Sequence, residues 1–364
     1  MMFSIIVAID NEYELTNNFI ENLFVTTSFD NGEIIIVADG CNYTTTIKYL
    51  KEISEKNKKI TFILNEHKSG YGIANNLAIE HSSGDYLVFI NSDVLPKDKS
   101  IEKLVTYLIN NPEVGAVQGL LIYPQNNLVQ STGHLFIDNH NTHVYKGKNP
   151  NDPIVQIIST RQALSTAFCA IPRYLFEHHH GFDSCYYNAY EGMELTLKIS
   201  LSGKKCVYYP EAIAYHITGV SRNQIPYNDK LSGIHFWKKW NSEIVYDLTK
   251  YIQPQVKQEM KNQIYFCVVC GHLCKWNKIL DKLEFNISGN ITVKNLYSSK
   301  IDLYTTLPYS AIRYDGPYIF LADSILELSG NRNWAEVRNN MQDLIIDAHG
   351  NLGYFNAIIG GSNS

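Results

Sequence analysis

Short apolar runs alternate with amphipathic stretches through the first half of the chain. The apolar runs are short and rich in β-branched residues, so they predict strands, and the stretches between them predict helices. The expected strands are residues 3–9, 33–38, 59–64, 85–90 and 114–123. The expected helices are residues 13–28, 44–56, 73–81 and 100–110. Connections of this length join parallel strands, so the pattern predicts an α/β fold with a mostly parallel sheet flanked by helices.

The alternation weakens after residue 124. Residues 126–152 are rich in Asn, His, Gly and Pro, which is typical of a long functional loop or a loose hairpin. A helix at about 191–202 and a strand at 205–209 follow. Residues 226–282 then look helical and residues 283–304 look like short strands, which predicts an additional C-terminal α+β region.

Composition and charge narrow the class of protein. The chain has 364 residues, of which 45% are hydrophobic and 18% charged, enough for two domains with ample core material. Its net charge of −5 offers no overall electrostatic attraction to nucleic acid. No apolar run approaches the roughly 18–20 residues of a transmembrane helix, and the N-terminus lacks the basic flank of a signal peptide. Seven cysteines, an odd number, indicate a reducing compartment, so we expect a cytoplasmic protein.

One cysteine cluster allows two interpretations. Cys267, Cys270 and Cys274, with His272 between them, offer four possible zinc ligands. However, a structural zinc site usually takes two separated ligand pairs, and no second pair follows. The three cysteines share one face of a predicted helix, where free cysteine behaves as a small hydrophobe, and we favour that interpretation.

Three acidic residues follow neighbouring predicted strands. Asp10 follows the first strand, Asp39 the second, and Asp93 closes the run Asn91-Ser92-Asp93 after the fourth. Ligands of parallel sheets bind beyond the carboxyl ends of the strands. Asp39 is placed to accept from a nucleobase or a ribose hydroxyl, and Asp93 is placed to bind a divalent cation that carries phosphates. The alternative, that each acid caps a helix, explains one acid more easily than three.

The loop before the third predicted helix contains two glycines, which would let its backbone approach a ligand at the carboxyl ends of the strands. Gly70-x-Gly72 resembles part of a dinucleotide fingerprint, but position 75 is Asn where the fingerprint has Gly or Ala. The fingerprint also normally follows the first strand. A nucleotide-binding loop therefore fits better than a Rossmann dehydrogenase, and a plain turn remains an alternative.

These segments and several others occur in an order that matches a known family. They are Ser4–Asn11, Ile36–Cys41, Gly70–Asn76, Gly84–Tyr86, Asn91–Asp93, Pro112–Gly115, Ser131–Gly133, Gly181–Asp183, Tyr190–Leu195 and Tyr209–His216. In order and spacing they resemble family 2 glycosyltransferases of the GT-A (Rossmann-like) fold, especially bacterial O-antigen and rhamnosyl-type transferases. The resemblance covers residues 3–222 and does not extend to the C-terminal part.

The resemblance implies a site for a nucleotide-sugar and a metal ion. Asn91–Asp93 resembles the DxD-type motif, so Asp93 is implied as a ligand of Mn²⁺ or Mg²⁺, with His216 as the second protein ligand. Carboxylate and imidazole ligands suit either metal, although a histidine on an apolar strand is often only a packed core residue. The implied donor-binding residues are Ala8, Asp10, Glu12, Asp39, Gly70, Asn75, Asn91 and Ser92.

The general base is where this chain departs from the family. An inverting transfer needs a base for the acceptor proton, and in the family the second residue of a Glu-Asp pair serves; here that residue is Gly192. Glu191 and Glu194 share one face of the first helical turn, and Asp183 lies nearby in sequence. We favour Glu191 as the base. In the alternative interpretation, the glutamates only stabilise the helix start.

Together these features predict a metal-dependent, inverting hexosyltransferase. We expect a UDP- or dTDP-linked sugar donor and a saccharide, lipid-linked saccharide or glycoprotein acceptor of surface polysaccharide or glycoconjugate synthesis. Residues 1–222 would be the transferase domain, with the nucleotide-sugar side at about 1–125 and the acceptor side at about 126–222; residues 223–364 have no assigned role. The segment 233–240 combines Trp and Lys as membrane-surface helices do, but we favour an ordinary packed helix there over peripheral membrane contact. A homo-oligomer is a further expectation. The alternatives are a non-catalytic sugar-nucleotide-binding protein and a sugar nucleotidyltransferase.

Overall fold

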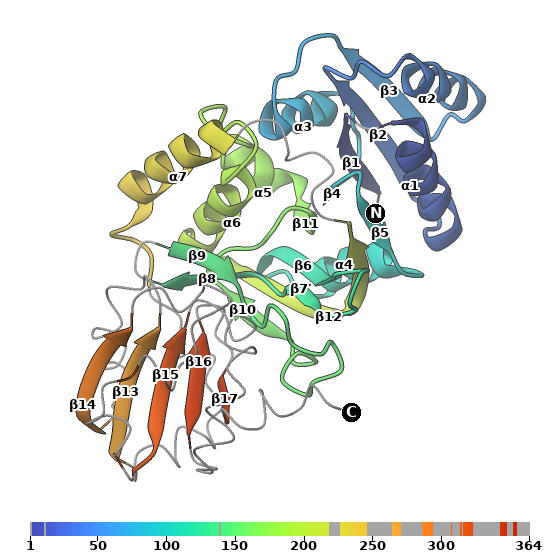
Figure 1. The fold of residues 1–364 in the computed structure, drawn as a ribbon. Coiled ribbons are helices and arrows are strands. Elements are labelled where there is room, and N and C mark those ends of the chain that lie inside the picture. Colours follow the sequence, from blue (N-terminus) through green and yellow to red (C-terminus); the bar gives the residue numbers. More distant parts are fainter. Residues whose placement is uncertain are drawn as a thin grey trace. The chain divides into compact units, whose positions relative to one another are not determined.

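Ten strands form one mixed sheet in the order β10-β12-β6-β11-β4-β1-β2-β3, with β5 paired to β12 and β7 to β6 (Figure 1). The computed structural model describes residues 2–10, 12–137, 140–217 and 226–245, and further on residues 264–270, 286–293, 307, 314, 316–322, 343–347 and 352–354. The strands of this sheet are β1 (Phe3–Ile9), β2 (Gly32–Asp39), β3 (Ile60–Asn65), β4 (Tyr86–Ile90), β5 (Val94–Pro96), β6 (Val114–Ile122), β7 (Val129–Ser131), β10 (Ser159–Arg161), β11 (Phe168–Pro172) and β12 (Lys205–His216).

The sheet is mixed and has a parallel part and an antiparallel part. Strands β4, β1, β2 and β3 are mutually parallel neighbours, as are β6 and β12. Strand β11 lies between β4 and β6 and runs antiparallel to both. The parallel part is the βαβ alternation that the sequence predicts, and the predicted α/β fold is confirmed.

Helices cover both faces of this sheet. They are α1 (Tyr13–Thr26), α2 (Thr44–Lys56), α3 (Tyr71–Glu80), α4 (Ser100–Asn110), α5 (Arg173–His178) and α6 (Glu191–Leu201). Alternate residues of β1 divide between the faces because side chains of a strand point to opposite sides. Ile5 and Val7 pack in one core with residues of α1, α2 and α4, and Ile6 packs in the other with residues of α3, α5 and α6. The strands between the two cores are therefore buried on both faces.

Contacts divide the chain into two compact units. The first comprises residues 1–134 and 147–244, and the second residues 135–146 and 245–364. Among the described residues of 126–152, β8 (His134–Ile137) and β9 (His140–His143) form a two-stranded sheet, which agrees with the second of the two expectations, a long loop or a loose hairpin. The functional boundary predicted at residue 222 stays a prediction.

The second unit contains a five-stranded sheet in the order β14-β13-β15-β16-β17. Its strands are β13 (Ile264–Cys270), β14 (Asn286–Val293), β15 (Tyr318–Ala322), β16 (Leu344–Asp347) and β17 (Leu352–Tyr354). Only β17 is antiparallel to its neighbour.

Strand β13 corrects the helix predicted over residues 226–282. The prediction holds for α7 (Pro226–Trp240), but residues 264–270 are a strand, because a short run of β-branched, aromatic and Cys residues suits a central strand buried by its neighbours. Cys267 and Cys270 are fully buried, as expected of small hydrophobes. His272 and Cys274 lie outside the described residues.

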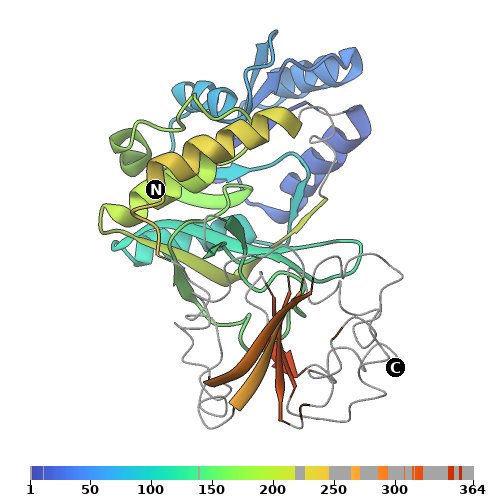
Figure 2. The same cartoon turned by 60° about the vertical axis from the view of Figure 1, so that its left-hand side comes forward.

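Helix α7 lies beside α6, as Figures 1 and 2 both show. The Tyr190 ring, just before α6, packs 5.3 Å from the Phe236 ring of α7. Within the described part of the chain, no helix is both long and apolar enough to cross a membrane.

Candidate active site

Asp93 lies in the turn between β4 and β5, where it meets the end of β12. The turn is tied down by two backbone bonds: Asn91 N–H donates to the Ala167 carbonyl at 3.1 Å, and Val94 N–H donates to the Asn91 carbonyl at 3.0 Å. Strand β5 runs antiparallel to β12 with Val94 opposite His216. This register places Asp93 Oδ1 3.2 Å from His216 Nε2, so the two implied metal ligands are brought together.

Gln130 of β7 orients the His216 ring. Its Oε1 lies 2.6 Å from His216 Nδ1, and the Gln130 side chain is buried. With Oε1 as acceptor, Nδ1 carries the proton, and the lone pair of the neutral ring at Nε2 faces the Asp93 carboxylate. Two acceptors at this distance repel each other unless a proton or a cation lies between them.

The Asp93–His216 pair fits a divalent ion. Cis ligands of an octahedral ion at about 2.1 Å are about 3 Å apart, close to the separation of Oδ1 and Nε2. A carboxylate with an imidazole is a donor set that Mn²⁺ accepts well. Gln130 was not foreseen from the sequence, because it lies in the irregular stretch 126–152, where no periodicity marks a functional position.

Asp39 organises the loop before α3. Its Oδ1 accepts from Ser69 N–H at 2.9 Å, Ser69 Oγ at 2.7 Å and Asn65 Nδ2 at 2.7 Å, and its Oδ2 accepts from Gly70 N–H at 2.9 Å. Gly70 has φ +93°, and a Cβ there would lie 2.3 Å from the Tyr187 carbonyl oxygen, so only glycine fits. Asp39 is 4% exposed, so its carboxylate binds the loop backbone and is not open to solvent.

Asp10 is neutralised by a lysine from the same loop. Lys68 Nζ forms an ion pair with Asp10 Oδ2. Burial opposes the charged form of Lys68, but the contact with Asp10 prevails and raises the lysine pKa. The loop backbone approaches Gly40 closely, since a Cβ on Gly40 would lie 2.6 Å from Lys68 N. Each of the three acids thus has its own partner at this edge, and Lys68 adds a cation that the sequence pattern did not indicate.

The remaining implied donor residues occupy different environments. Ala8 is half-buried within β1 and Glu12 is exposed just before α1. Ser92 is buried in the turn before Asp93. Asn75 is fully buried in α3, where its Nδ2 donates to the Tyr71 carbonyl at 2.7 Å. This contact favours a role for Asn75 in helix packing over direct contact with a donor.

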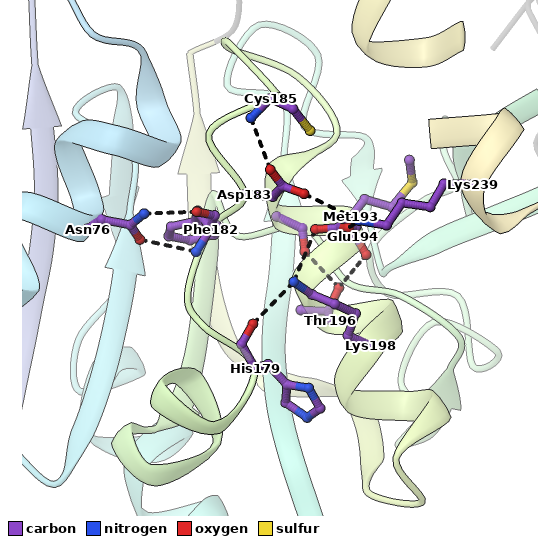
Figure 3. Close-up of polar contacts among 11 residues, drawn as sticks. Asn76, His179, Phe182, Asp183, Cys185, Met193, Glu194, Thr196, Lys198 and Lys239 are labelled. Atoms are coloured by element: carbon purple, nitrogen blue, oxygen red, sulfur yellow. Dashed lines mark hydrogen bonds and ion pairs between the residues drawn. The ribbon is translucent and has the colours of Figure 1, made fainter. Parts of the chain in front are cut away.

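Two of the three candidate bases are held by lysines (Figure 3). Glu194 is fully buried, with Lys239 at 2.6 Å and Lys198 at 3.2 Å from its two oxygens. Asp183 lies 3.3 Å from Lys239 and accepts from Cys185 N–H at 3.0 Å. Although burial acts in the opposite direction, hydrogen bonds from Cys185 and Lys239 lower the pKa of Asp183 to about 2. A carboxylate stabilised in this way is a poor proton acceptor at neutral pH.

Glu191 is the third candidate, at the first position of α6. It is 6% exposed and lies against α3, since a Cβ on Gly72 would be 3.6 Å from Glu191 Cβ. Burial, together with the nearby charge of Glu191, raises the pKa of the Tyr71 hydroxyl. Glu191 therefore lies against the α3 side of the site.

Gly192 has no room for a side chain. A Cβ at this position would lie 2.0 Å from Thr166 Oγ1 and 2.8 Å from Thr166 Cγ2. The Thr166 side chain, from the segment before β11, fills the space that an aspartate would need. Gly192 and Thr166 therefore depart from the family motif together: the glycine leaves space, and the Thr166 side chain occupies it.

Comparison with known proteins agrees with this architecture. Residues 4–168 match the family model "Glycosyl transferase family 2". The chain is 26% identical over 247 residues to the O-antigen biosynthesis protein RfbC of Myxococcus xanthus. The aligned region covers 65% of this chain and 19% of that protein. It is also 31% identical over 120 residues to an uncharacterized glycosyltransferase of Haemophilus influenzae, covering 33% of this chain and 36% of the relative. The chain therefore spans well under half the length of these relatives.

A solved structure shares the fold. The crystal structure of GalNAc-T7 with UDP, GalNAc and Mn²⁺ superposes with a TM-score of 0.56 at 14% identity, over 79% of this chain and 55% of that one. The expected GT-A fold is confirmed by this likeness and by the sheet. Over residues 4–168, the family this chain is similar to is glycosyl transferase family 2.

Proposed function

We propose that this protein is a metal-dependent, inverting glycosyltransferase that moves a sugar from a UDP- or dTDP-linked donor to a saccharide acceptor. The observation that supports it best is the facing pair Asp93 and His216, with Oδ1 and Nε2 3.2 Å apart at the carboxyl edge of the sheet. The name of the RfbC relative supports an acceptor in surface polysaccharide synthesis. Location in the cytoplasm stays a prediction.

Asp93 and His216 would hold Mn²⁺ or Mg²⁺. When bound, such an ion neutralises charge that grows on the leaving phosphate as the glycosidic bond breaks. Gln130 keeps the His216 lone pair directed at the ion, and the backbone bonds of Asn91 and Val94 hold the turn that carries Asp93. The site is therefore preorganised by this chain's own residues.

The donor nucleotide would lie along the edge formed by the ends of β1, β2 and β4. The loop held by Asp39 presents Ser69 and Gly70 there, and Lys68 provides a positive charge beside Asp10. A diphosphate would be attracted by Lys68, and a nucleobase or ribose would find an acceptor in Asp10, while Asp39 holds the loop in place. That the GalNAc-T7 structure holds UDP and Mn²⁺ supports this class of donor.

Glu191 would remove the proton from the acceptor hydroxyl. It is buried at the first position of α6, beside Gly72 of α3, and belongs to the segment that resembles the family's base motif. Glu194 and Asp183 instead anchor α7 to α6 through Lys239. The proton would pass from the acceptor oxygen to the Glu191 carboxylate as that oxygen attacks the sugar from the face opposite the phosphate.

A nucleotide-release assay tests the proposal. UDP-, dTDP- and GDP-sugars would be screened with Mn²⁺, with Mg²⁺ and with chelator, in the presence of mixed saccharide acceptors. We expect release from a UDP- or dTDP-sugar that requires the metal. Full activity in chelator would contradict metal dependence, and release from GDP-sugars alone would contradict the proposed donor class.

Gly192 motivates one alternative, a sugar-nucleotide-binding protein without catalysis. Thr166 fills the place of the family's base, so the alternative predicts tight nucleotide binding and no turnover with any acceptor. Calorimetry of UDP binding beside the turnover assay separates the two functions.

A further inference from the structure

Three metal-binding side chains gather near the start of α6, apart from the Asp93–His216 pair. Asp183 and Cys185 come from the segment before α6, and His235 comes from α7. A carboxylate oxygen, the Cys185 sulfur and a His235 ring nitrogen all lie within 4.8 Å of one another. All three residues belong to the first compact unit, so their arrangement is part of one folded body.

We propose that Asp183, Cys185 and His235 form a binding site for a thiophilic divalent cation, with Zn²⁺ as the fitting ion. Thiolate, imidazole and carboxylate are the ligands that zinc takes in proteins. Three protein ligands leave one position of a tetrahedral ion open to water. Magnesium and calcium prefer oxygen ligands alone, so this set discriminates against them.

Each ligand is already oriented by its surroundings. Asp183 Oδ1 accepts from Cys185 N–H at 3.0 Å, which closes a tight turn and directs the two side chains to the same place (Figure 3). The His235 ring packs edge-on against Tyr186 at 5.4 Å between ring centroids. Cys185 and His235 are exposed, so an ion can reach the site from solvent.

The neighbouring lysine does not prevent binding. Lys239 lies 3.3 Å from Asp183 Oδ2, but it has a closer partner in Glu194 Oε1 at 2.6 Å. Asp183 can therefore turn an oxygen to a metal while Lys239 stays bound to the buried glutamate. In the proposed step the thiol proton goes to solvent and the ion takes its place between sulfur and carboxylate, releasing one proton per ion bound.

Occupation of the site would link two elements beside the proposed base. The segment containing Asp183 leads into α6, whose first residue is Glu191, and His235 lies on α7. An ion bonded to both would fix α7 against the start of α6. The proposed glycosyl transfer is not required for this inference, because it depends only on the three side chains.

Cobalt substitution tests the proposal. Co²⁺ bonded to a thiolate gives an intense charge-transfer absorption that oxygen and nitrogen ligands do not give. We expect the full chain, kept reduced, to develop this absorption at one Co²⁺ per protein, to release a proton on binding, and to lose the absorption when Zn²⁺ is added. Cys185→Ser should abolish the absorption, and His235→Ala should weaken Co²⁺ binding because one of the three ligands is lost.

Two controls separate this site from others in the chain. Cys274→Ser, in the cysteine-containing run 267–274, should keep the absorption, as should Asp93→Asn, in which the proposed catalytic metal site is altered. Circular dichroism checks that each variant folds. An absorption that persists in Cys185→Ser, or none in the wild-type protein, would overturn the proposal whether or not the protein transfers sugar.

Discussion

Asp93 Oδ1 and His216 Nε2 lie 3.2 Å apart, joined by the antiparallel pairing of β5 with β12. Gln130 Oε1 lies 2.6 Å from the opposite ring nitrogen of His216, and with that nitrogen as donor the Nε2 atom is left facing the carboxylate. An arrangement of two facing acceptors is stable only with a proton or a cation between them. This relationship supports the metal dependence of the proposed function, since a cation between the two groups would remove their repulsion.

Removal of the Gln130 acceptor should weaken metal binding. In Gln130→Leu, His216 can rotate or change tautomer, and we expect the affinity for Mn²⁺ to fall about 10–100-fold. Electron paramagnetic resonance of free Mn²⁺ measures the affinity, and nitrogen NMR reports the His216 tautomer. Gln130→Glu, which keeps an acceptor, is the matched control. Equal Mn²⁺ affinity in wild type and Gln130→Leu would show that the ring needs no such support.

Glu191→Gln should reduce the rate of transfer without loss of fold. As a general base, the carboxylate contributes about 10²–10⁴ to the rate, and donor binding should change little. Steady-state kinetics with the donor identified in the screen provide kcat and KM separately. An unchanged kcat would show that Glu191 is not the general base.

Glu194→Gln should instead affect stability. The substitution leaves Lys198 and Lys239 beside a buried neutral amide, and we expect a loss of about 1–3 kcal/mol in the free energy of unfolding. Urea unfolding measures this loss. A Glu194→Gln protein with wild-type stability and no turnover would reverse the roles assigned to the two glutamates.

Gly192→Ala should destabilise the protein by about 1–3 kcal/mol, because its Cβ would meet Thr166 Oγ1 at 2.0 Å. The double variant Thr166→Gly with Gly192→Ala should recover part of this loss, since the obstructing side chain is gone. Thermal unfolding of the two single variants and the double variant gives the coupling. Purely additive effects would mean that Thr166 is not what excludes a side chain from position 192.

Asp183 should contribute to stability at neutral pH and lose that contribution in acid. Its pKa is about 2 in the folded protein against an ordinary value of 3.8, so the unfolded chain binds the proton first as pH falls. We expect the unfolding free energy of the wild type to fall more steeply between about pH 4 and pH 2 than that of Asp183→Asn. Urea titrations across this range test it, and parallel curves would contradict the assigned shift.

Much of the fold could be predicted because local pattern and tertiary packing agree there. The apolar run of β1 and the amphipathic α4 each bury the residues that their periodicity indicates. The pattern failed at β13, where Cys267 and Cys270 also fit the spacing of a helix face. A short apolar run does not distinguish a buried helix from a buried strand, and here the neighbouring strands decided the outcome.

The site could be predicted only in part. Asp93 and His216 come together as the resemblance implied, since strand ends of a known topology fix their meeting. Lys68 and Gln130 were not foreseen, because their roles depend on loop paths that no periodicity encodes. The role of Thr166 could not be predicted either, because it depends on the packing of its side chain against Gly192 in the folded chain.

The most direct test of the central claim is nucleotide release by Asp93→Asn beside the wild type, with Mn²⁺ and the donor identified in the screen. The substitution keeps the size of the side chain and removes its charge, so the protein should fold normally by circular dichroism. The account predicts metal-dependent release by the wild type, and no release together with lost Mn²⁺ binding in the variant. Full activity of a folded Asp93→Asn protein would contradict it.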